Sequence, residues 1–298
     1  MKTATRKIEI FGTAGLAVVL VVLAIWRLGT ILPLPRPPFD GERAYQDVLT
    51  QMAFGPRIPD SSAHTRTVAW LESELHNAGW QVTIQKATEM GHPLQNVIAN
   101  HTGDPPVIIL GAHYDSRLLA DQDHGPGRNA PVPGADDGAS GVAVLVELAR
   151  SLPRDAIPVQ LVFFDAEDNG GIAGWDWLLG SEAYVARLTN HPRAAVILDM
   201  VGDADLNIYM ECNSDPSLRQ AIWAQAASLG YAKEFIPQVK YCMLDDHTPF
   251  LQAGIPAVDI IDFDYPYWHT AADTADKVSA QSLQTVGRTV LAWLQHQK

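Results

Sequence analysis

The stretch "VQLVFFDAEDNG", residues 159–170, begins as an apolar run and ends in acids. Continuous apolar runs of this kind are typical of central strands that are covered on both faces of a sheet. Three carboxylates then follow within four positions, at Asp165, Glu167 and Asp168. Clustered carboxylates repel one another when they are ionised, so the end of this predicted strand is a candidate site for a cation.

Comparable apolar runs recur along the chain and alternate with helical patterns. Strands are predicted over residues 81–85, 96–100, 106–113, 159–166, 194–202 and 255–263. Helical periodicity predicts helices over residues 67–80, 140–152 and 280–295. Alternating strands and helices predict an α/β fold with a mostly parallel, mixed central sheet that is flanked by helices on both faces.

The composition is that of an acidic globular protein. Hydrophobic residues make up 47% of the 298 residues and charged residues 18%, which is ordinary for a chain with a sizeable core. The formal net charge of −13 argues against a nucleic-acid partner, because no basic patch is available to neutralise phosphates. Beyond residue 39 no second linker or repeat interrupts the sequence, so residues 40–298 are predicted to form one domain.

The first 28 residues predict a membrane anchor. Three basic residues within positions 2–7 precede residues 10–26, a run of seventeen without charge or proline. This length is near the lower limit for a helix that spans a bilayer. It is long for a cleaved signal peptide, which is the alternative, and no clear A-x-A cleavage site follows it. We therefore predict a single-pass anchor over residues 1–28 with a cytoplasmic basic end.

The segment after the anchor predicts a stalk. Residues 29–39 include prolines at 33, 35, 37 and 38, which favour an extended, semi-rigid spacer. The rest of the chain is then expected on the extracytoplasmic side of the membrane. There, Cys212 and Cys242 either form one disulfide or are two separate buried thiols, and the sequence leaves both possibilities open.

Residues that bind metals follow the predicted strands. His113 and Asp115 follow one strand, Glu167 and Asp168 another, and Asp199 a third. In open α/β sheets, ligands bind at the carboxyl ends of the strands. Imidazole and carboxylate groups without thiolates suit zinc, and one extra acid beside them suits the base of a metal-dependent enzyme.

Two further segments complete the candidate set. Asp136 and Asp137 lie directly ahead of the predicted helix at 140–152, and either could instead cap that helix. His269 stands in "YWHT", residues 267–270. The polar segment 118–134 is rich in glycine and proline and is predicted to be a loop near the mouth of the site, without an assigned role.

These segments carry a resemblance. From residue 46 to the C-terminus the chain resembles the zinc aminopeptidase-type superfamily, and most of all its glutaminyl-peptide cyclotransferases, or glutaminyl cyclases. "DDHTPFL", "YWHT" and the insertion "GIAGWDWLLGSE" are the features more specific to the cyclases. The segments that match are 111–116, 133–150, 162–170, 198–202, 245–260 and 267–270.

The resemblance implies one zinc ion per chain, held by Asp137, Asp168 and His269. Glu167 would then be the general acid and base. The family commonly has Glu-Glu where this chain has Glu167 and Asp168. Aspartate remains a good zinc ligand, but it is shorter by one methylene, so we expect the strand end to lie closer to the metal.

The implied reaction converts the N-terminal glutamine of a peptide or protein to pyroglutamate and releases ammonia. Zinc would polarise the side-chain carbonyl, and Glu167 would carry a proton from the amine to the leaving ammonia. Asp245 would hold the amide nitrogen, and Asp199 would share protons with Glu167. Trp268 is expected to form a wall of the substrate pocket, with Trp175 and Trp177 as weaker candidates.

Two other functions remain open. A two-metal aminopeptidase would use His113 and Asp199 as additional ligands, with Asp137 as the bridge, and would hydrolyse N-terminal residues. A membrane-tethered binding domain on a degenerate peptidase scaffold would have lost its ligands. Metal content separates the three hypotheses: two ions for the aminopeptidase, none for the binding domain and one for the cyclase.

Overall fold

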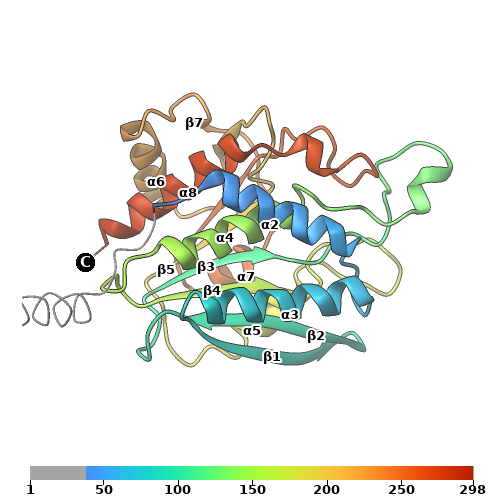
Figure 1. Cartoon of the computed structure of the whole chain (residues 1–298), viewed down its shortest axis with the longest axis horizontal. Coiled ribbons are helices and arrows are strands. Elements are labelled where there is room, and N and C mark those ends of the chain that lie inside the picture. The colour runs from blue at the N-terminus through green and yellow to red at the C-terminus, as the bar shows by residue number, and fades with distance from the viewer. Residues whose placement is uncertain (1–37, 298) are drawn as a thin grey trace, which may run out of the picture. The chain divides into compact units, whose positions relative to one another are not determined.

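The central sheet explains how distant parts of the sequence reach one site. The computed structural model describes residues 38–297, and its sheet has six strands in the order β1-β2-β4-β3-β5-β8 (Figure 1). The strands are β1 (Gln81–Glu89), β2 (His92–Asn100), β3 (Ile108–His113), β4 (Val159–Phe164), β5 (Ala194–Asp199) and β8 (Ala257–Ile261).

The pairing confirms a mixed α/β sheet. β3 pairs in parallel with β4 and with β5, and β5 pairs in parallel with β8. β1 and β2 form an antiparallel hairpin, and β2 is antiparallel to β4. The carboxyl ends of the four parallel strands therefore lie at one edge of the sheet, where the predicted ligands follow them.

Helices cover both faces of the sheet. One hydrophobic cluster joins the sheet to α2 (Gly41–Phe54), α3 (Ser62–Asn77), α4 (Ala139–Ser151), α6 (Pro216–Ser228) and α8 (Ala280–Gln295). On the opposite face, Tyr184 of α5 (Leu179–Val185) and Phe250 of α7 (Thr248–Gln252) pack on Phe164 of β4. Burial on both faces explains why β3, β4 and β5 read as continuous apolar runs.

Most predicted elements are present with shifted ends. The helix over residues 280–295 has the predicted bounds. The helix predicted over 67–80 begins at Ser62, where Ser61 caps it, and ends at Asn77, before Gly79 with φ of +86°. The sequence patterns did not predict α2 and α6, the short helices α5 and α7, or the two-stranded sheet of β6 (Ile208–Met210) and β7 (Phe235–Val239). α6 buries only Ile222, Trp223 and Ala226, too few for a strong periodic signal.

The predicted anchor over residues 1–28 lies outside the described residues, as does most of the stalk. Between residues 38 and 297 no helix is both long and apolar enough to cross a membrane. The described elements belong to one compact unit, Pro37–Lys298. Within it Cys212 and Cys242 form a disulfide, with Cα atoms 4.8 Å apart, which decides between the two possibilities that the sequence left open. The bond joins the segment after β6 to the segment that leads to α7.

Candidate metal centre and active site

The predicted site residues gather around one cavity at the carboxyl edge of the sheet. Its volume is about 240 Å³. Five acids and a histidine form its polar side: Asp137, Glu167, Asp168, Asp199, Asp245 and His269. The apolar side is formed by Trp177, Met200, Met243, Leu244, Ile261, Phe263 and Trp268. The structure thus brings together the predicted ligands, the predicted catalytic acids and Trp268, whereas His113 contacts Asp137 and Asp199 without lining the cavity.

Asp137, Asp168 and His269 form a group that could hold a metal ion. Each offers one ligand atom, and the three atoms lie within 4.8 Å of one another. His269 Nε2 is 2.7 Å from Asp168 Oδ1 and 3.7 Å from Asp137 Oδ2. Asp137 Oδ2 and Asp168 Oδ2 are buried and have no hydrogen-bond partner in the described part of the chain. Unpaired buried carboxylate oxygens are costly without a cation, so these residues fit a zinc ion.

The turn before α4 aims Asp137 at the cavity. Asp273 accepts hydrogen bonds from the backbone N–H groups of Asp136 and Asp137, at 2.9 and 3.3 Å. Asp136 itself accepts from the N–H of Gly202 at 2.7 Å, so its role is structural. Gly138 has φ of +94°, and a Cβ there would lie 2.6 Å from the carbonyl oxygen of Asp115. The second aspartate of "GADD" is therefore the one that is free to bind a metal.

Asp115 positions the acid pair and does not line the cavity. Its oxygens accept from the N–H groups of Glu167 and Asp168, at 3.1 and 3.4 Å, and from Asn169 Nδ2 at 3.3 Å. The chain turns at Ala166, which has φ of +51°. Asp168 points to His269 while Glu167 faces the cavity beside it. The buried aspartate thereby divides the two acids between ligand and non-ligand positions.

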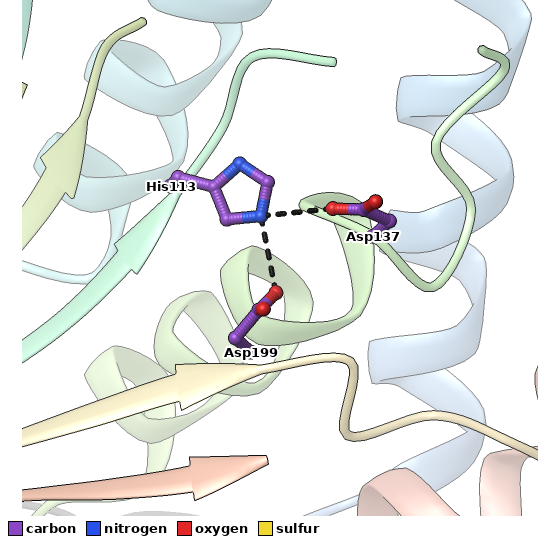
Figure 2. A group of neighbouring side chains, drawn as sticks. All are labelled: His113, Asp137 and Asp199. Carbon is purple, nitrogen blue, oxygen red and sulfur yellow. Dashed lines mark hydrogen bonds and ion pairs between the residues drawn. The ribbon is translucent and has the colours of Figure 1, made fainter. Parts of the chain in front are cut away.

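A second group of ligand type lies behind the first and shares Asp137 with it. Figure 2 shows His113 Nε2 between Asp137 Oδ1, at 3.2 Å, and Asp199 Oδ1, at 3.1 Å. His113 Nδ1 is 3.5 Å from Asp115 Oδ1. Burial alone lowers the pKa of His113, but its hydrogen bonds with the three carboxylates raise that pKa well above the ordinary value. All five positions of a two-metal site are therefore present.

Burial raises the pKa of three acids that line the cavity, Glu167, Asp199 and Asp245. Burial raises the pKa of Glu167 well above its ordinary value; the charge of His113 opposes the shift, and the charges of Asp168 and Asp245 add to it. Burial, followed by the charge of Asp199, raises the pKa of Asp245 to about 7. Burial also raises the pKa of Asp199 itself. Acids with such pKa values can exchange protons with a substrate near neutral pH.

Two tryptophan rings lie near the imidazole of His269. The Trp268 ring stacks on the imidazole at 3.8 Å, and Phe263 packs edge-on against Trp268 at 5.1 Å. The Trp177 ring lies parallel to the imidazole at 6.0 Å. Trp175 is different, because it stacks on His92 at 3.6 Å and does not line the cavity. Of the two weaker tryptophan candidates, Trp177 is thus the one that the fold places in the site.

The apolar rim of the cavity and a buried ion pair were not predicted from the sequence. Leu244, next to Asp245, is a large apolar side chain that lines the cavity and is 56% exposed. In the sequence, only its position directly before "DDHTPF" pointed to the site. Deeper in the molecule, His247 Nε2 lies 3.3 Å from Glu211 Oε2, and both side chains are fully buried. Burial would raise the pKa of Glu211, but hydrogen bonds from His247 and the backbone lower it to about 2.

The candidate metal ligands at the carboxyl ends of the parallel strands are typical of a metal-dependent enzyme. Comparison with known proteins identifies the family of this chain. The model of peptidase family M28 matches residues 96–294, and the chain belongs to this family. Glutaminyl cyclase from Bacteroides thetaiotaomicron, solved bound to N-acetylhistamine, is 32% identical with a TM-score of 0.82; the match covers 88% of this chain and 100% of that one. This match confirms the predicted resemblance to glutaminyl cyclases of the zinc exopeptidase-like superfamily.

The chain is also similar to an aminopeptidase and to a further cyclotransferase-like protein. A leucine aminopeptidase precursor from Bacteroides thetaiotaomicron is 32% identical with a TM-score of 0.83, over 89% of this chain and 100% of that one. The glutaminyl-peptide cyclotransferase-like protein of Bos taurus is 26% identical over 288 residues, which covers 80% of this chain and 71% of that protein. Because proteins with both names share the fold, the choice between the two activities depends on the site.

Proposed function

We propose that the chain is a glutaminyl-peptide cyclotransferase that converts the N-terminal glutamine of peptides or proteins to pyroglutamate. The observation that carries the proposal is the position of Asp245, which lines the same small cavity as Glu167 and the candidate metal ligands. Asp245 adds a hydrogen-bond acceptor for the side-chain amide nitrogen of a glutamine, beyond the single base that activation of water needs. The similarity to solved glutaminyl cyclases supports the same conclusion.

Asp137, Asp168 and His269 would hold the zinc ion that the family implies. When bound there, zinc supplies a Lewis acid for the side-chain carbonyl of glutamine. The two unpaired oxygens of Asp137 and Asp168 and the Nε2 atom of His269 are the donors available for it. One ion per chain is part of the proposal.

Glu167 moves the proton of the reaction. The α-amine of the substrate forms a bond to the side-chain amide carbon, the C–N bond of the amide breaks, and ammonia leaves. Glu167 accepts a proton from the attacking amine and returns it to the leaving nitrogen. Burial raises the pKa of Glu167 well above its ordinary value, which favours the return of the proton to the leaving nitrogen.

The other groups of the cavity position the substrate. Asp245 accepts a hydrogen bond from the amide nitrogen and so orients the leaving group. Trp177 and Trp268 form walls of the cavity near His269, which restrict the space to a single extended side chain. The walls also exclude water, which would otherwise hydrolyse the amide.

One observation favours a second candidate, a two-metal aminopeptidase. His113, Asp137 and Asp199 (Figure 2) offer ligand atoms within 4.8 Å of one another, and this group shares Asp137 with the first set. With an ion in each set, Glu167 would activate water for peptide hydrolysis.

Membrane attachment is part of the proposed function. The apolar run at residues 10–26 supports an anchor, and the Cys212–Cys242 disulfide supports an oxidising compartment for the catalytic domain. Substrates would then be exported peptides or proteins. Protease protection in spheroplasts tests this topology, because an extracytoplasmic domain is digested without lysis and a cytoplasmic one only after lysis.

The activity test combines metal analysis with two substrates. Zinc content is measured on purified protein, ammonia release on a glutaminyl peptide, and amide cleavage on a leucyl chromogenic amide. One zinc per chain with ammonia release and an untouched leucyl amide is the expected result. Two zincs with leucyl-amide cleavage would establish the aminopeptidase instead.

A further inference from the structure

The loop after β3 carries an ion pair that reaches two of the candidate metal ligands. Arg117 forms a bidentate ion pair with Asp121. Its Nε and Nη2 atoms donate to the two carboxylate oxygens of Asp121 at 2.9 and 2.6 Å. The Arg117 side chain is 4% exposed and that of Asp121 is 26% exposed. A bidentate pair of this kind has a defined orientation, so it is able to hold its neighbours in place.

Arg117 connects the pair to Asp168. Its Nη1 donates to the carbonyl oxygen of Asp168 at 2.8 Å, and its Nη2 donates to that of Gly170 at 3.2 Å. The same Nη1 lies 4.0 Å from Asp168 Oδ1. The guanidinium carbon is also 5.0 Å from the centre of the Trp177 ring, within the range of a cation–π contact. One arginine therefore supports both a candidate ligand and the aromatic wall beside it.

Asp121 connects the pair to His269. Asp121 Oδ1 is 3.8 Å from His269 Nδ1, whereas Nε2 of the same ring points at Asp168. A separation of 3.8 Å is an electrostatic contact and longer than a hydrogen bond. A negative charge beside Nδ1 favours the tautomer that has its proton there, which leaves the Nε2 lone pair for a metal.

Two hydrogen bonds join the same loop to the turn that contains His269, one between backbone groups and one from the backbone to a side chain. The N–H of Gln122 donates to the carbonyl oxygen of His269 at 3.2 Å, and the N–H of Ala271 donates to Asp123 Oδ2 at 2.8 Å. His269 has φ of +55°, a conformation that costs free energy for a residue with a side chain. The surroundings must hold such a conformation, and the loop at 121–123 is among the segments that do so.

We propose that Arg117 and Asp121 are a positioning pair that orients Asp168 and His269 together and selects the metal-binding tautomer of His269. The inference rests on the proposed function only in taking Asp168 and His269 as zinc ligands. It also assigns a role to the loop over residues 118–134, because the carboxylate that this loop brings to His269 raises the affinity of the site for zinc.

The test measures zinc affinity on the intact chain, by competition with a chromophoric chelator, for the wild type, Asp121→Asn and Arg117→Lys. Asp155→Asn is the matched control, since Asp155 is an exposed acid that precedes β4 at the opposite edge of the sheet. We expect Asp121→Asn to weaken zinc binding by about 10-fold to 100-fold. Arg117→Lys retains the charge but not the fork, so it should weaken binding in the same direction, and Asp155→Asn should not.

Two further readouts separate positioning from folding. The melting temperature of the metal-free protein should be unchanged in Asp121→Asn, and the number of zinc ions at saturation should stay the same. Equal zinc affinity in Asp121→Asn and Asp155→Asn would overturn the proposal. So would an affinity loss that is accompanied by a matching fall in metal-free melting temperature. Ammonia release is measured on the same samples. A wild-type protein that binds zinc but releases no ammonia would contradict the cyclase function without contradicting the proposal for Arg117 and Asp121.

Discussion

The two histidine–aspartate groups that share Asp137 differ in what their atoms already contact. In the group with Asp168 and His269, each carboxylate has one buried oxygen without a hydrogen-bond partner in the described chain. In the other group, His113 Nε2 sits between Asp137 and Asp199 at 3.2 and 3.1 Å (Figure 2). Its Nδ1 is 3.5 Å from Asp115 Oδ1 and has no hydrogen-bond partner in the described chain.

The difference teaches which group needs a cation. A histidine that faces carboxylates with both nitrogens is stabilised as the imidazolium, and that positive charge offsets the acids around it. His269 also faces carboxylates with both nitrogens, Asp168 at 2.7 Å and Asp121 at 3.8 Å. The first group nevertheless has two buried carboxylate oxygens without a hydrogen-bond partner in the described chain, Asp137 Oδ2 and Asp168 Oδ2. One zinc in the first group and a protonated His113 in the second is the arrangement that a cyclase with a single ion requires.

Removing a ligand from the first group should have the largest effect. Asp168→Asn takes away a charged donor, so we expect loss of bound zinc and of all detectable ammonia release. Elemental analysis after dialysis and a coupled ammonia assay measure the two. Full activity in a zinc-free Asp168→Asn protein would show that the first group is not the catalytic metal site.

Glu167→Gln should separate catalysis from metal binding. Glutamine cannot accept the proton of the attacking amine, so kcat should fall by about 10²-fold to 10⁴-fold while zinc content stays at the wild-type value. Steady-state kinetics on a glutaminyl peptide, with zinc analysis of the same preparation, measures this. A variant that loses zinc together with activity would assign Glu167 to the ligands.

His113→Gln tests the second group directly. If His113 is an imidazolium and not a ligand, zinc per chain should be the same in variant and wild type, and kcat should fall by about 10-fold to 100-fold. The loss is smaller than for Glu167→Gln because Asp199 would be misplaced but the base kept. A drop from two zincs to one would instead identify a two-metal site.

A third histidine, His247, forms with Asp245 and Asp259 a further group that could hold a metal ion, and it also faces Glu211. His247 is paired with Glu211, whose pKa is lowered from 4.5 to about 2. A carboxyl with a lowered folded-state pKa stabilises the fold above its unfolded pKa, and this contribution is lost as pH falls from 4.5 towards 2. Glu211→Gln should therefore be less stable than wild type at pH 7 by about 1–3 kcal/mol.

Urea unfolding at pH 7 and at pH 3 measures this smallest effect. The gap in unfolding free energy between Glu211→Gln and wild type should narrow at the lower pH. A gap that is independent of pH would mean that the Glu211 charge does not contribute to stability.

Local sequence determined the elements whose residues carry their own signal. The continuous apolar runs identified β3, β4, β5 and β8, and an amphipathic period identified α8 with its observed bounds. The family resemblance implied the candidate ligands. Asp137 stands just before the predicted helix at 140–152 and Asp168 just after a predicted strand, whereas His269 stands in "YWHT", away from any predicted element. Strand order explains why they meet, since parallel neighbours end at one edge.

Tertiary structure alone decided the contacts between residues that lie far apart in the chain. Arg117 reaches Trp177, and Asp121 reaches His269, only because the loop after β3 folds back over the cavity. The disulfide and the buried pair of Glu211 and His247 are likewise set by where β6 and α7 lie. Periodicity and motif report the environment of each residue along its own element, whereas a partner 30 or more residues away is specified by packing of the whole chain.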